Sequence, residues 1–168
     1  MEFTHQFITV ATKRLRYYKA LGDKTFEQLS EAEMHYRASE ESNSIAIIIQ
    51  HLYGNMMSRF TSFLTEDGEK DWRKRDAEFE PTEFTKRDLL DFWNTGWAML
   101  LNTIAALQPQ DLLKQITIRE EPLFVYDAVL RQLAHYPYHV GQIVFIGKML
   151  KDTAWVNLSM PKKTNTVG

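Results

Sequence analysis

Cysteine is absent from all 168 residues of the chain, and this absence removes several kinds of chemistry together. Without a thiol the chain has no disulfide, no cysteine nucleophile, no cysteine-ligated zinc and no iron–sulfur cluster. Any thiol chemistry must therefore use a thiol that a substrate or cosubstrate brings.

Long apolar runs and a strong charge of one sign are also lacking. No apolar run approaches the roughly 18 residues of a membrane-spanning helix, and the first residues lack the basic and apolar regions of a secretory signal. The formal net charge is −2 and the basic residues are scattered, unlike the basic patch of a nucleic-acid-binding protein. We therefore expect a cytoplasmic protein that has no membrane segment and binds neither DNA nor RNA.

The length and the apolar periodicity predict a single all-α domain over residues 1–160, followed by a frayed tail at 161–168. Apolar residues recur at helical spacing in four segments, near 3–21, 42–64, 85–107 and 124–150. Gly22 is interpreted as a helix stop, and Ser42 or Asn43 and then Thr85 as helix caps. Residues 115–119 alternate and precede a turn at 120–122, which predicts a short β-ribbon. The expected fold is a four-helix up-and-down bundle with this ribbon before the last helix.

Two histidines, His135 and His139, lie four residues apart in the last predicted helix. Residues at this spacing share a helix face, about 5–6 Å apart, so two imidazoles there can converge on one ion. Pro137 lies between them and predicts a kink or a locally opened turn. On its own the pair is a weak signal, and it is more typical of two histidines that neighbouring side chains or water satisfy.

A third histidine, His51, occurs in another strongly apolar helical segment, and a buried imidazole needs a polar partner. Three histidines from two helices would form an open metal site, with water or substrate at the remaining position. Asn55, one turn after His51, either orients the ring or a ligand, or makes an ordinary hydrogen bond between helices. Gln142 and Arg131 share the face of the histidine pair and are the other polar candidates beside the site.

Two further features have alternative interpretations. The charged connection at residues 66–83 is either a lid or dimer arm, or an ordinary solvated loop. Aromatic residues make up 12% of the chain, and they either contact a substrate or fill the core. The candidates for substrate contact are Tyr53, Trp93, Trp97 and Tyr138.

The histidine segments carry a resemblance to a known family. The chain reads His51-Leu52-Tyr53-Gly54-Asn55 in its second helix and His135-Tyr136-Pro137-Tyr138-His139-Val140-Gly141-Gln142 in its fourth. This arrangement resembles the DinB-like (YfiT-like) superfamily of metal-dependent enzymes. The order of elements, the length and the stretch Asn43-Ser44-Ile45 are similar to its small Bacillus-type branch of YizA-like proteins.

The resemblance implies a left-handed variant of the four-helix bundle, commonly a homodimer. It also implies a divalent metal, zinc or nickel, held by His51, His135 and His139. Relatives in that superfamily include thiol S-transferases and isomerases that use bacillithiol, mycothiol or glutathione, and others with no known activity.

Two functions follow as hypotheses. In the first, the chain is a thiol S-transferase-like enzyme or hydrolase in which a metal-activated low-molecular-weight thiol or water attacks a small electrophilic substrate. Arg131 or Arg59 would then contact an anionic thiol cosubstrate. In the alternative, the chain is a non-enzymatic, stress-related scaffold that binds metal or dimerises. An accessible cavity beside the metal would favour the enzyme, and an apolar plug would favour the scaffold.

Overall fold

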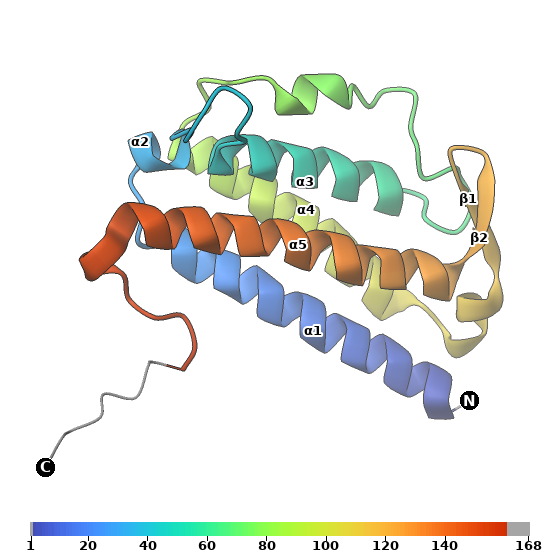
Figure 1. Cartoon of the computed structure of the whole chain (residues 1–168). Coiled ribbons are helices and arrows are strands. Elements are labelled where there is room, and N and C mark those ends of the chain that lie inside the picture. The colour runs from blue at the N-terminus through green and yellow to red at the C-terminus, as the bar shows by residue number, and fades with distance from the viewer. Residues whose placement is uncertain (1, 161–168) are drawn as a thin grey trace, which may run out of the picture.

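A computed structural model describes residues 2–160, and over this range the protein is mainly helical (Figure 1). Its five α-helices are α1 (Glu2–Phe26), α2 (Glu31–Met34), α3 (Ile45–Phe60), α4 (Lys86–Ala106) and α5 (Val125–Lys151). Three short 3₁₀ segments are η1 (Asp76–Phe79), η2 (Pro109–Leu113) and η3 (Asp152–Ala154). The tail expected at 161–168 lies outside the described residues. None of the described helices is long and apolar enough to span a membrane.

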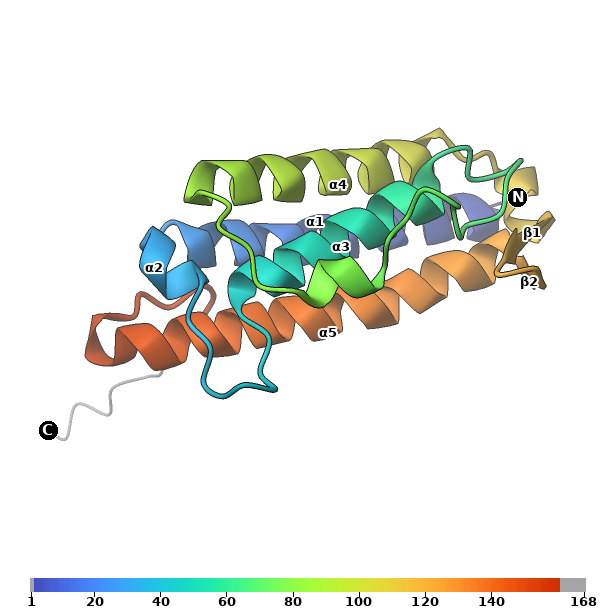
Figure 2. The same cartoon turned by 90° about the horizontal axis from the view of Figure 1, so that it is seen from above.

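The four long helices lie side by side, with α2 at one end (Figures 1 and 2). Their directions differ from the expected up-and-down alternation. Along α3 and α4, Tyr53 stacks on Phe92, and Thr103 donates a hydrogen bond to the carbonyl of Phe60. Phe60 follows Tyr53 along α3, and its partner Thr103 follows Phe92 along α4. The two helices therefore run in the same direction. The expected alternation is wrong here because the long connection between them returns the chain to the starting end of α3.

The predicted ribbon is confirmed as a two-stranded antiparallel sheet of β1 (Gln115–Ile118) and β2 (Glu121–Phe124). Its turn consists of Arg119 and Glu120, which have φ values of 56° and 64°. Both are in the left-handed region that normally favours glycine, so this turn is held by contacts from elsewhere in the fold.

The helix ends depend on side-chain caps. Thr85 caps α4 as predicted, and its hydroxyl and the Asp88 carboxylate form a reciprocal capping box. Helix α3 is capped by Ser44, whose hydroxyl accepts the N–H of Ile47, rather than by Ser42 or Asn43. The helix ends at Phe60, earlier than expected.

Gly22 is not a helix stop, because α1 continues past it to Phe26. A Cβ at this position would collide with the indole of Trp93, so glycine permits close packing between α1 and α4. Trp93 and Trp97 are almost fully buried in the core formed by the four long helices. Helix α5 continues through Pro137 without a break, so the locally opened turn, one of the two alternatives expected there, is not seen.

Candidate metal centre

Helices α3 and α5 bring the imidazoles of His51, His135 and His139 together. The Nε2 atom of His135 lies 3.4 Å from Nε2 of His51 and 3.1 Å from Nε2 of His139. The possible ligand atoms of all three residues lie within 4.8 Å of one another. His51 and His139 are buried and His135 is half-buried, so the three rings form a compact cluster under the surface.

The opposite nitrogen of His51 is held by a carboxylate. Its Nδ1 lies 3.0 Å from Oε2 of Glu78 in η1, and a carboxylate can only accept, so Nδ1–H is the donor. Arg73 donates two hydrogen bonds to the same carboxylate, from Nε at 2.7 Å and Nη2 at 2.8 Å. Burial raises the pKa of Glu78, but the bonds from Arg73 and His51 outweigh it and lower that pKa overall. The carboxylate is therefore ionised and fixes the tautomer of His51.

Glutamines on α5 contact the other two rings in the same way. His139 Nδ1 lies 2.9 Å from Oε1 of Gln142, and His135 Nδ1 lies 3.4 Å from Oε1 of Gln132. Each glutamine is three residues from its histidine, one on either side of the pair. With Nδ1 donating in all three rings, every Nε2 carries a free lone pair that faces the other two.

The environment keeps the rings of His135 and His139 neutral. Burial is the largest cause that lowers the pKa of His135 to about 3, and the neighbouring His139 and His51 rings add to it. Burial also lowers the pKa of His139 to about 4, although its hydrogen bond with Gln142 works in the opposite direction. At neutral pH both residues therefore present an unprotonated nitrogen, which is the form that binds a metal.

The cluster fits a single divalent cation. Three lone pairs pointing at one another repel unless a cation lies between them. Nitrogens that ligate one tetrahedral ion at about 2.0–2.1 Å are separated by about 3.3 Å, and two of the observed separations are 3.1 and 3.4 Å. Metal-ligating histidines also usually donate their second N–H to a carboxylate or carbonyl oxygen, as these three do. The three residues could thus hold a metal ion.

The other predicted site residues have different surroundings. Asn55 accepts a hydrogen bond of 2.9 Å from the hydroxyl of Tyr136, so it makes the interhelical contact that was one of its two interpretations. Gln142 contacts His139 directly. Arg131 is exposed, and it has no hydrogen bond or ion pair to the residues that the structure describes. Asn55, Gln142 and Arg131 all line one cavity together with the three histidines.

This cavity has a volume of about 480 Å³. Tyr138 lines it, whereas Trp93 and Trp97 lie in the core and Tyr53 stacks against Phe92. Three of the four aromatic candidates therefore belong to helix packing. Phe79 of η1, which the sequence did not single out, also lines the cavity and packs against His51 with ring centroids 4.8 Å apart.

The charged connection supplies residues that sequence reasoning missed. Its η1 segment lies over α3 on the side that faces α5 (Figure 2), where Glu78 reaches His51. Gly54 permits this approach, because a Cβ there would collide with the Glu78 carboxylate. Nothing in the spacing distinguishes Glu78 from the other acidic residues of the connection. For Gln132 a signal exists, since it mirrors the histidine-to-glutamine spacing of Gln142.

Comparison with known proteins gives a family without an assigned activity. The sequence model of the family described as protein of unknown function (DUF1572) matches residues 2–164, which is nearly the whole chain. No curated protein and no solved structure gives a significant match.

Proposed function

The chain belongs to the DUF1572 family, and we propose that it is a metal-dependent enzyme that holds one divalent ion on His51, His135 and His139. One observation carries this proposal. The Nε2 atoms of the three histidines converge, while the Nδ1 atom of each ring donates a hydrogen bond to a side-chain oxygen. We further propose that it is a member of the DinB-like superfamily, close to the YizA-like branch. Its four long helices would then be that superfamily's left-handed four-helix bundle.

The proposed chemistry is that of a thiol S-transferase or a hydrolase. Zinc or nickel bound there would lower the pKa of a coordinated thiol or water toward neutrality and so supply a nucleophile. The chain has no cysteine, so the thiol would come from a low-molecular-weight cosubstrate. The electrophile would be a small molecule in the adjoining cavity.

The residues around the centre have separate tasks in this proposal. Glu78 and Arg73 hold His51 in the Nδ1–H tautomer, and Gln142 and Gln132 do the same for the paired histidines. Phe79 covers one face of the His51 ring and excludes water from it. These contacts keep the three Nε2 atoms aimed at one point without any rearrangement when substrate arrives.

The cavity supports the enzyme over the non-enzymatic scaffold. A scaffold needs no access to its ion, whereas an enzyme needs room for a substrate beside the open coordination position. The histidines border a cavity of about 480 Å³, and its lining is mostly polar side chains rather than an apolar plug. A volume of this size suits a small-molecule ligand.

Metal analysis tests the first part of the proposal. Protein purified without a nickel column is expected to contain about one divalent ion per chain. His135→Ala should lose the ion, while the control His35→Ala should keep it, because His35 instead contacts the Phe84 carbonyl outside the cluster. A metal-free wild type whose stability does not change when zinc or nickel is added would overturn the proposal.

Activity is assayed separately as the consumption of a low-molecular-weight thiol together with an alkyl halide or an epoxide. The enzyme is expected to accelerate this reaction only when it is loaded with metal, and His135→Ala should be inactive. If loaded protein accelerates neither this reaction nor hydrolysis of the same electrophiles, the scaffold is the better account.

We also propose that the protein is a homodimer, as the family resemblance implies. Large apolar side chains remain exposed on α5, with Phe145 at 70% and Leu130 at 46%. Burying them against a second copy would remove apolar surface from water. Light scattering should give twice the mass of the chain, and Phe145→Glu should reduce it toward the monomer. A monomer at micromolar concentration would contradict this part.

A further inference from the structure

The cavity beside the histidines is unusually rich in guanidinium groups. Among the described residues, no carboxylate lines it, although five arginines do. They come from α3, from the charged connection, from the hairpin turn and from α5. The five are Arg59, Arg73, Arg75, Arg119 and Arg131.

The carboxylates that pair with these arginines do not balance their charges. Those in contact with the five arginines are Glu69, Glu78 and Asp76. Five positive groups against three negative ones leave an excess of two. A divalent ion on the histidines would add to that excess. An anionic ligand would offset this excess positive charge.

Arg119 and Arg131 leave most of their hydrogen-bond donors unused. Arg119 uses only Nε, in a bond of 2.9 Å to Oε2 of Glu69, and its two terminal nitrogens have no partner among residues 2–160. Arg131 has no hydrogen bond or ion pair within the same range, and it lies one helical turn before His135. Each of the other three has a carboxylate partner: Glu69 for Arg59, Glu78 for Arg73 and Asp76 for Arg75, although Nη1 of Arg73 has no hydrogen-bond partner among the described residues.

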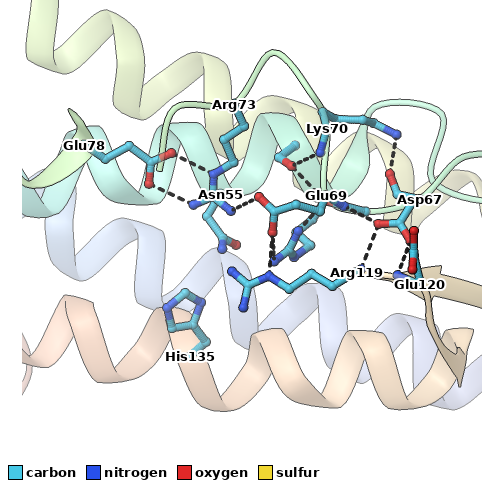
Figure 3. A network of polar contacts seen from close by, with 12 residues as sticks. Asn55, Asp67, Glu69, Lys70, Arg73, Glu78, Arg119, Glu120 and His135 are labelled. Carbon is cyan, nitrogen blue, oxygen red and sulfur yellow. Dashed lines mark hydrogen bonds and ion pairs between the residues drawn. The ribbon is translucent and has the colours of Figure 1, made fainter. Parts of the chain in front are cut away.

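Arg119 is placed in the cavity by a strained turn. Its φ of 56° and the 64° of Glu120 are unfavourable for residues other than glycine. Asp67 compensates, because its carboxylate accepts the backbone N–H groups of both residues, at 2.9 and 2.8 Å. Figure 3 shows Arg119 extending from this turn past Glu69 toward the end of the network where Asn55 and His135 lie. Asp67 is thus a positioning residue for Arg119.

We propose that Arg119 and Arg131 form a subsite that binds the oxyanion of a substrate, a carboxylate or a phosphate. The planar guanidinium matches both groups with paired N–H donors. The subsite orients the substrate so that its reacting end faces the histidine cluster. This last step rests on the function proposed above, whereas binding of the anion itself does not require a metal.

The test titrates inorganic phosphate and, separately, L-malate into the metal-free full chain and follows heat release and the thermal unfolding midpoint. We expect at least one of the two to bind at millimolar concentration, and the stronger arm identifies the group that the subsite prefers. Arg119→Gly and Arg131→Gln should each weaken binding about ten-fold or more. Arg14→Gln is the control and should bind as wild type, because Arg14 is exposed on α1 and does not line this cavity.

Arg119→Gly also separates binding from folding, because glycine suits the φ of this position and leaves the turn intact. Asp67→Asn provides a test of sign. It removes a negative charge, so long-range electrostatics alone would strengthen anion binding, whereas loss of the positioned turn should weaken it.

Absence of binding by both probes, or unchanged binding in Arg119→Gly, would overturn the inference. Tighter binding in Asp67→Asn would overturn the positioning role. His135→Ala distinguishes this proposal from the function proposed above. It should lose the metal and keep the anion, so a failed metal site and a failed anion subsite give different results.

Discussion

Replacing Glu78 with glutamine tests how strongly the hydrogen bond at Nδ1 of His51 supports metal binding at Nε2 of the same ring. The carboxylate of Glu78 accepts from His51 Nδ1 and holds two bonds from Arg73. Glutamine keeps the size and one acceptor oxygen but loses the charge, and its NH₂ group must face a donor. The result is an imidazole whose tautomer and orientation are no longer fixed.

The size of the effect follows from the burial of the pair. Loss of the hydrogen-bond partner of a ligating histidine costs about 10–100-fold in metal affinity, or about 1.4–2.7 kcal/mol. The side chain of Arg73 is only 2% exposed and that of Glu78 is 11% exposed. Glu78→Gln leaves the Arg73 charge buried, with Glu69 at 3.6 Å as partial compensation. We therefore expect the free energy of unfolding of the metal-free protein to fall by about 2–4 kcal/mol.

The assay is competition with a chelator for zinc, together with urea unfolding of the metal-free protein. Glu80→Gln is the matched control, since Glu80 is exposed in the same segment. Gly54→Ala is a second variant, because its methyl group displaces the Glu78 carboxylate without changing any charge. It should lower metal affinity in the same way. If Glu78→Gln and Gly54→Ala both bind zinc as tightly as wild type, Glu78 does not orient His51 for metal binding.

Three further predictions concern stability. Gly22→Ala should lower the free energy of unfolding by about 1–3 kcal/mol, because the added methyl overpacks the indole of Trp93; an unchanged urea midpoint would contradict this packing. Glu120→Gly should raise the free energy of unfolding by up to about 1 kcal/mol, because Glu120 has a φ of 64°, which glycine adopts without strain. A lower urea midpoint than wild type would show that the turn is unstrained. The pKa values of His135 and His139 are lowered to about 3 and about 4 from 6.5, so the unfolded chain takes up protons first as the pH falls. The metal-free protein should therefore lose stability progressively below about pH 6.5, less steeply in His139→Ala; equal slopes would refute this origin.

Local patterns in the sequence were sufficient for most of the elements. The ribbon, the Thr85 cap and the last helix follow from alternation, capping chemistry and periodicity, which act over a few neighbouring residues. The proximity of His135 and His139 is equally local, because one helical turn separates them. Gly22 shows the limit of such rules, since its role is to contact Trp93 on another helix.

Contacts between distant segments were decided only by the tertiary structure. The direction of α4 depends on where a long connection places it, and no local pattern encodes that path. The same connection brings Glu78 to His51. The hairpin brings Arg119 to the cavity beside the histidines, which Arg131 also lines. The sequence by itself therefore determined the helices and the proximity of His135 and His139, because both depend on neighbours within a turn, whereas tertiary packing brought His51 to that pair. Packing of the whole chain determined which charges surround the histidines, because ion pairs form between any segments that the fold brings within a few ångströms.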